Sequence, residues 1–257
     1  MRPYPFPTGQ TADVNGTELA IMLAAVVVGS TVKAITGMGL PIIAIPIAAL
    51  FIDFDDAVVV LAIPSALANV VLAGRERHHI DQTRDLGRLA AFGIGGAVVG
   101  TIAFVSLPET PLVLALVFVI SLYVVAFFVH PNLQTSPQTS RRWSPVVGSV
   151  AGVFQGAVGI SGPIVQAWVH SYRLPQSAHI VTVTTLFGIT GIAQVVVLAI
   201  DGEFDSRLGP SLAACLPVLA SIPLGTRLRD RMSSRSFDLA VVAVLILSAA
   251  ALLLRTV

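Results

Sequence analysis

The amino-acid sequence predicts an all-α integral membrane protein of two inverted repeats of five helical segments each, in which the first two segments of each repeat form a broken helical hairpin. Three observations lead to this fold class. Of the 257 residues, 55% are hydrophobic and only 11% are charged, whereas soluble domains carry about 25% charged residues. Glycine- and proline-rich breaks recur at matched positions in the two halves of the chain. The arginines gather in a few of the loops, which sets the orientation of membrane helices.

The apolar stretches define ten helical segments, because about 20 apolar residues cross the ~30 Å hydrocarbon core of a bilayer. In the first half these stretches are Leu19–Ile35, Leu40–Ile52, Ala57–Ala73, Leu86–Ser106 and Leu112–Val129. In the second half they are Val146–Val158, Ile164–His170, Ile180–Ile200, Leu208–Gly225 and Phe237–Leu254. The first two of each half are shortened, and none shows the alternation of a β-barrel strand. We therefore expect a helical bundle.

The division of the chain follows from these segments. We expect a polar N-terminal segment over 1–17, a first repeat over 18–130, a cytoplasmic linker over 131–144 and a second repeat over 145–257. The first apolar stretch is interpreted as mature sequence rather than a signal peptide, because Arg2 is an isolated charge far from it and the same pattern recurs in mid-chain.

An internal repeat is indicated by the two glycine- and proline-rich breaks. Pro41 and Pro163 lie 122 residues apart, and the same offset places Gly37 on Gly159 and Lys33 on Gln155. After a three-residue insertion, Ser65 falls on Thr190 and Asn69 on Gln194. Weak duplication with interrupted segments at equivalent positions is typical of transporters.

The arginines indicate that the two repeats are inverted. If the break before Pro163 turns the chain back to its own side, eleven arginines lie in cytoplasmic loops and only Arg207 and Arg255 lie outside. The eleven are Arg75, Arg77, Arg84, Arg88, Arg141, Arg142, Arg173, Arg227, Arg229, Arg231 and Arg235. This distribution obeys the positive-inside rule and places both termini on the outer side.

The two hairpin tips predict an anion site near the membrane midplane. A helix that begins there has unpaired N–H groups and a partial positive charge, both of which favour an anion. The acidic residues lie in loops or at segment ends, whereas Lys33 lies deep in an apolar segment. An ionisable group inside the membrane indicates function, and the neutral polar residues near the tips can donate further hydrogen bonds. The candidate substrate-binding residues are Lys33, Thr36, Gly37, Met38, Gly39, Ser65, Asn69, Gln155, Gly159, Ile160, Ser161, Gly162, Gln166, Thr190 and Gln194.

Other classes of site are not expected. The net charge of +1 gives no field for nucleic acid, and the single cysteine, Cys215, excludes a disulfide within the chain. His78 and His79 lack zinc-site spacing and are interpreted as part of a solvated loop, whereas His170 and His179 are weaker candidates for proton coupling. No nucleotide-binding loop or hydrolase motif occurs. We expect no cofactor, no metal and no enzymatic activity.

Two glycine-rich segments resemble a known family. Gly37-Met38-Gly39-Leu40-Pro41 with the apolar run to Pro46, the segment from Gly152 to Pro163 and the duplicated layout of the chain are similar to the sulfite exporter (TauE/SafE) family of membrane permeases. The resemblance implies transport of sulfite, sulfonates or related sulfur oxyanions across the bacterial inner membrane.

The expected function is that of a secondary transporter for a small anion, working by alternating access. A passive anion channel, a membrane-embedded enzyme and a non-catalytic subunit of a larger complex are the alternatives. The candidate partners are the anionic substrate, membrane lipid and a second copy of the chain in a homodimer.

Overall fold

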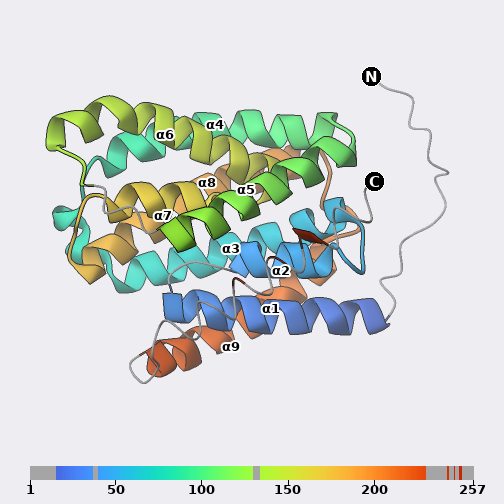
Figure 1. Ribbon diagram of the computed structural model, residues 1–257. Coiled ribbons are helices and arrows are strands. Elements are labelled where there is room, and N and C mark those ends of the chain that lie inside the picture. The colour runs from blue at the N-terminus through green and yellow to red at the C-terminus, as the bar shows by residue number, and fades with distance from the viewer. Residues whose placement is uncertain are drawn as a thin grey trace.

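The chain forms a bundle of helices in the computed structural model, which describes residues 16–36, 40–129 and 134–229 together with Val242, Ile246, Ala249 and Ala250. The elements are α1 (Gly16–Thr36), α2 (Leu40–Ala48), α3 (Phe54–Arg75), the 3-10 helix η1 (Arg77–Gln82), α4 (Leu86–Ser106), α5 (Glu109–Val129), α6 (Pro137–Val158), α7 (Gly162–His170), α8 (Gln176–Ile200) and α9 (Leu208–Arg229) (Figure 1). All secondary structure of these residues is helical, which confirms the predicted all-α class.

Three of the helices are long and apolar enough to cross a membrane, namely α3, α4 and α8. Helices α1, α5 and α9 contain shorter apolar cores over Met22–Lys33, Glu109–Val125 and Leu208–Pro223. The predicted segment Phe237–Leu254 lies outside the described residues except for four positions, and so do residues 1–15.

Most helix bounds agree with the apolar stretches, and α6 shows the largest difference. It begins at Pro137, well before the predicted start at Val146, so part of the expected linker over 131–144 is helical. The hydroxyl oxygen of Ser136 accepts a hydrogen bond from the Thr139 N–H at 3.2 Å, which is an N-cap, and Pro137 suits the first turn. A search for apolar residues misses these turns because most of their side chains are polar and exposed.

Glycines allow α4 and α6 to pack at very short range. A Cβ on Gly96 would collide with the carbonyl oxygen of Ser149, and one on Gly152 would collide with that of Gly93. The same holds for Gly100 against Val153 and for Gly156 against Ala97. Helices in membranes associate through small residues that let the backbones approach. Helices α4 and α6 are therefore packed backbone against backbone.

Helix α2 is short and enclosed by protein. Leu40, Ile42, Ile43, Ile45 and Pro46 are all buried, and they belong to a core that also includes residues of α1, α3, α5 and α6. Non-helical backbone at membrane depth is tolerated where protein surrounds it. The burial of α2 places the start of this short helix inside the bundle.

The two ends of the bundle differ in charge. At one end the Arg84 guanidinium lies over the Tyr172 ring, 4.9 Å from its centroid, and Arg88 donates a hydrogen bond to the Arg141 carbonyl oxygen at 3.3 Å. At the other end Arg207 forms ion pairs with Asp56, at 2.6 Å, and with Glu203. Helices α3 and α8 connect these ends in opposite directions (Figure 1).

Candidate functional site

The second helical hairpin turns at Gly159. This residue ends α6 with φ of 72°, and its N–H donates a hydrogen bond to the Gln155 carbonyl oxygen at 2.9 Å. Glycine is the residue that adopts this left-handed conformation without steric cost. Helix α7 then begins at Gly162, with Pro163 in its first turn, where a missing N–H removes no intrahelical hydrogen bond.

The first helical hairpin has the same order of features. Helix α1 ends at Thr36 and α2 begins at Leu40 with Pro41 in its first turn. The two helices lie close together, since a Cβ on Gly29 of α1 would stand 2.8 Å from the Leu40 carbonyl oxygen. Each hairpin thus places the start of a short helix inside the bundle.

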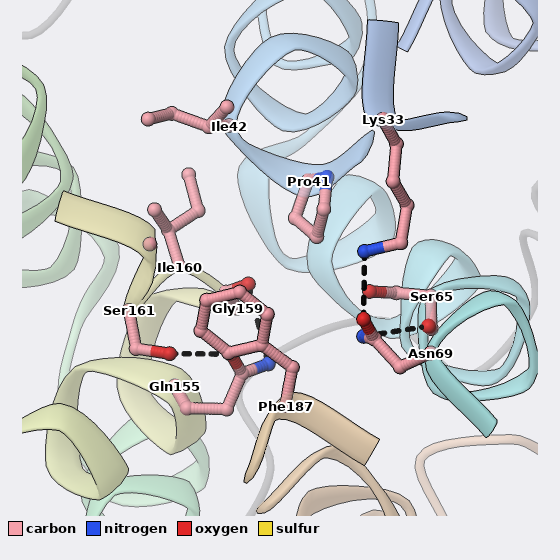
Figure 2. A pocket seen from close by; sticks show the side chains of 11 residues that line it. Lys33, Pro41, Ile42, Ser65, Asn69, Gln155, Gly159, Ile160, Ser161 and Phe187 are labelled. Carbon is pink, nitrogen blue, oxygen red and sulfur yellow. Dashed lines mark hydrogen bonds between the residues drawn. The ribbon is translucent and has the colours of Figure 1, made fainter. Parts of the chain in front are cut away.

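A small cavity lies between the two breaks and is the candidate functional site (Figure 2). Its lining residues come from both hairpins and from α3 and α8: Lys33, Pro41, Ile42, Ser65, Asn69, Gln155, Gly159, Ile160, Ser161, Gly162 and Phe187. The interior space is that of about one or two water molecules. A bound ion of a few atoms therefore fits only with a modest outward movement of the lining.

Lys33 is the ionisable residue of this cavity. Its side chain is 2% exposed, and its Nζ donates a hydrogen bond to Asn69 Oδ1 at 2.7 Å (Figure 2). The Phe187 ring centroid lies 5.8 Å from the same nitrogen, within the range of a cation–π contact. Asn69 is in turn oriented by its Nδ2, which donates to the Ser65 carbonyl oxygen at 2.9 Å. The amino group of Lys33 is thus held at the cavity wall by neutral groups.

The opposite wall is built around Gln155. Its Nε2 donates hydrogen bonds to Gln194 Oε1 at 3.2 Å and to the Gly159 carbonyl oxygen at 3.3 Å. Its Oε1 accepts a hydrogen bond from the Ser161 hydroxyl at 3.0 Å. Gln194 also donates to the Gly156 carbonyl oxygen at 3.3 Å. These contacts fix the second break, and they present amide and hydroxyl groups without a net charge.

The two walls make the same contact at positions that the sequence repeat pairs with each other. Lys33 of α1 donates to Asn69 of α3, and Gln155 of α6 donates to Gln194 of α8. The offset that aligns the breaks places Lys33 on Gln155 and, after the insertion, Asn69 on Gln194. One wall therefore has an ammonium group where the other has an amide.

The structure brings together many of the residues predicted from the sequence. Those on the cavity wall are Lys33, Ser65, Asn69, Gln155, Gly159, Ile160, Ser161 and Gly162. Gln194 lies behind the wall through its bond to Gln155. Gly37, Met38 and Gly39 lie outside the described residues, and so does the side chain of Thr36.

Besides Gln194, two predicted residues do not line the cavity. The Thr190 hydroxyl donates to the Leu186 carbonyl oxygen one turn earlier in α8, at 2.8 Å, a local bond that removes it from ligand contact. Gln166 lies in the middle of α7, where its Oε1 is 2.7 Å from His179 Nε2. The ring of His170 is 6.4 Å from that of His179, so both histidines belong to the contact between α7 and α8.

Three lining residues were missed from the sequence, namely Pro41, Ile42 and Phe187. Phe187 precedes Thr190 by three residues and Gln194 by seven, so a helical face drawn through the two polar residues includes it. Ile42 follows Pro41 in the first turn of α2. Ile42 and Phe187 are apolar residues in apolar helices, and composition alone gives them no distinguishing signal.

The chemistry of the cavity suits an anion. Of its lining side chains, Lys33 is the one that carries charge, and the others are amides, a hydroxyl pair and apolar groups. Helix α7 begins at the cavity wall, and helix N-termini favour anions. Among the described residues there is no group of three or more His, Cys, Asp or Glu that could hold a metal ion.

Comparisons with known proteins give one match. A family model described as "Sulfite exporter TauE/SafE" matches residues 21–252, which is most of the chain and includes both hairpins. No curated protein and no solved structure matches the chain.

Proposed function

Because the chain belongs to the sulfite exporter TauE/SafE family, we propose that it is a secondary transporter that moves a small anion, sulfite or an organosulfonate, across the bacterial inner membrane by alternating access. The family and the apolar helices α3, α4 and α8 make the chain a membrane protein of a permease family. The substrate, its binding site and the transport mechanism are the proposed part.

The observation on which the proposal depends is the cavity between the two helix breaks, with the ammonium of Lys33 at its wall. A charged side chain in the membrane interior is costly. The burial of Lys33 against neutral partners is explained if a bound anion supplies the counter-charge. The second N–H of the Asn69 amide can then donate a hydrogen bond to an oxygen atom of the anion. The Gln155 amide and the Ser161 hydroxyl can do so only if they leave their present acceptors.

The packing of the helices supports two inverted repeats. Under the sequence offset, α1 to α4 of the first repeat correspond to α6 to α9 of the second. Helix α1 packs on α9 and α6 packs on α4, α3 packs on α9 and α8 packs on α4, and α3 packs on α8. Each of these contacts has its counterpart when the two repeats are exchanged. A site between such repeats can open to one side of the membrane at a time.

The charge of the two ends supports the orientation. The end that includes Arg75, Arg84, Arg88 and Arg141 is rich in arginine, and the end that includes Asp56 and Glu203 is acidic. By the positive-inside rule the arginine-rich end faces the cytoplasm. Exposed apolar side chains on the outside of α4 and α5, such as Val99 and Phe118, are then in contact with lipid.

Counterflow distinguishes a carrier from a passive channel. Proteoliposomes with the full chain are loaded with unlabelled sulfite and diluted into a trace of labelled sulfite, with protein-free liposomes as the control. A carrier exchanges the two pools, so the label rises transiently above its equilibrium level inside. Label that only approaches equilibrium, without an overshoot, would identify a channel and contradict the proposed mechanism.

A further inference from the structure

The charge around the cavity is that of one cation. Of the eleven described lining residues Lys33 alone is ionisable. The Nζ of Lys33 is in contact with the Asn69 amide oxygen and the Phe187 ring. Neither of these partners is ionised, so the ammonium has no counter-charge among the lining residues.

In the second repeat, the position equivalent to Lys33 is occupied by the uncharged Gln155. Gln155 lies on the cavity wall at the position that the repeat pairs with Lys33, and its amide donates to Gln194 as Lys33 donates to Asn69. A lysine at both positions would give the cavity two positive charges. At these two paired positions the chain has a lysine and a glutamine, so the lining of the cavity can carry at most a single positive charge.

We propose that the cavity selects anions by their charge, so that it binds a singly charged oxyanion and discriminates against a doubly charged oxyanion of the same shape. For sulfite this means the hydrogensulfite form rather than the fully deprotonated ion. The inference rests on the proposed function, because it concerns the anion that occupies the same cavity. With a monoanion bound, the charges of ligand and Lys33 cancel. With a dianion bound, one negative charge stays buried without compensation, and an uncompensated buried charge is strongly destabilising.

Three tetrahedral sulfur compounds of similar size test this inference directly. Dimethyl sulfone is uncharged, methanesulfonate is a monoanion and sulfate is a dianion, so the series varies charge at nearly constant shape. The measurement is the rise in unfolding temperature of the purified full chain in detergent as each compound is titrated at constant ionic strength. A ligand that binds only the folded protein stabilises it by RT ln(1 + [L]/Kd), so the dissociation constant follows from how the unfolding temperature rises with ligand concentration.

Wild-type protein is expected to bind methanesulfonate about 100-fold more tightly than either sulfate or dimethyl sulfone. Sulfate also stabilises proteins by exclusion from their surface, so the shift seen with Lys33→Gln, which lacks the cation, is subtracted as the non-specific part. Equal specific shifts from sulfate and methanesulfonate would overturn the inference, and so would the absence of any shift that depends on Lys33.

A second cation supplies the converse test. Gln155→Lys adds a charge at the repeat-equivalent position on the wall, and this variant is expected to bind sulfate more tightly than methanesulfonate. Its folding is checked by the elution volume in size-exclusion chromatography. If the folded variant keeps the wild-type order, selection by charge count is wrong. If the variant does not fold, the wild-type series still decides the question.

Measurements of binding and of flux on the same purified protein distinguish a failure of this inference from a failure of the proposed function. Specific binding of methanesulfonate without any sulfite flux would contradict transport and support charge selection. Saturable sulfite flux that sulfate inhibits as strongly as methanesulfonate would support transport and overturn charge selection.

Discussion

The ammonium of Lys33 and the amide of Asn69 meet in the interior of the bundle, where Lys33 Nζ donates a hydrogen bond to Asn69 Oδ1 at 2.7 Å. The two side chains come from α1 and α3 and are 2% and 3% exposed. Because the acceptor is a neutral oxygen, the pair leaves the positive charge uncompensated. This arrangement keeps the Lys33 amino group at the cavity wall.

A carboxylate at position 69 should block anion binding. In Asn69→Asp the new carboxylate would form an ion pair with Lys33, and the site would have no net charge to offer. We expect methanesulfonate to bind at least about 100-fold more weakly, while the protein still folds. Asn69→Ser, which stays neutral, is the matched control and should keep most of the affinity. Undiminished binding by folded Asn69→Asp would show that Lys33 does not contact the anion.

The packing of α4 on α6 makes opposite predictions for two adjacent glycines. A Cβ on Gly96 would collide with the Ser149 backbone, whereas a Cβ on Gly95 meets nothing within 4 Å. Gly96→Ala should lower the free energy of unfolding by about 1–3 kcal/mol or more through overpacking. Gly95→Ala should be neutral or raise it by up to ~1 kcal/mol, because alanine is the better helix former. Thermal unfolding of the two variants in detergent checks this contrast, and equal stability of both would contradict the observed packing.

Two glycines of the second hairpin give a similar pair of predictions, which distinguish an effect on stability from an effect on ligand binding. Gly159 has φ of 72°, and a Cβ there would stand 2.7 Å from Ile45 Cδ1. Gly159→Ala should therefore cost about 1–2 kcal/mol from the backbone alone. A Cβ on Gly162 meets nothing within 4 Å, so Gly162→Ala should keep the stability of the wild type. Since Gly162 lines the cavity, the added methyl group should weaken methanesulfonate binding.

Thermal unfolding and methanesulfonate titration test both variants of this hairpin. Loss of stability in Gly162→Ala, or an unchanged stability in Gly159→Ala, would mean that the hairpin turns in another way.

Cysteine substitutions at two exposed aspartates can test the orientation of the chain in the membrane. Asp81 lies in η1, within the arginine-rich α3–α4 connection, and Asp205 lies in the α8–α9 turn. In a Cys215→Ser background, we expect Asp205→Cys to react with a membrane-impermeant maleimide in intact spheroplasts and Asp81→Cys to react only after lysis. The reverse pattern would mean that the arginine-rich end faces outward.

The helix breaks and the buried cation could be predicted from the sequence because each is a local signal. Gly159 and Pro163 interrupt an apolar run, and Lys33 is a charge in such a run. The repeat then brought Asn69 and Gln155 into the prediction, although neither is unusual by itself. These three kinds of signal located most of the polar lining of the cavity.

Other parts of the site depend on tertiary contacts that one sequence does not show. Phe187 is an ordinary apolar residue until α8 places its ring near Lys33. Thr190 matches Ser65 in the repeat, yet its hydroxyl bonds to its own helix. The start of α6 at Pro137 follows from the cap at Ser136, a polar signal that apolar patterning misses. The close approach of α4 and α6 became visible only with the two backbones side by side.

Uptake of labelled sulfite into proteoliposomes, compared between the wild type and Lys33→Ala, tests the central claim most directly. Ser211→Ala is the matched control, since Ser211 is a buried polar residue that bonds to the Val60 carbonyl oxygen away from the cavity. We predict saturable uptake by the wild type and the control, and uptake at the level of protein-free liposomes for folded Lys33→Ala. Undiminished uptake by Lys33→Ala would contradict the assignment of this cavity as the anion site.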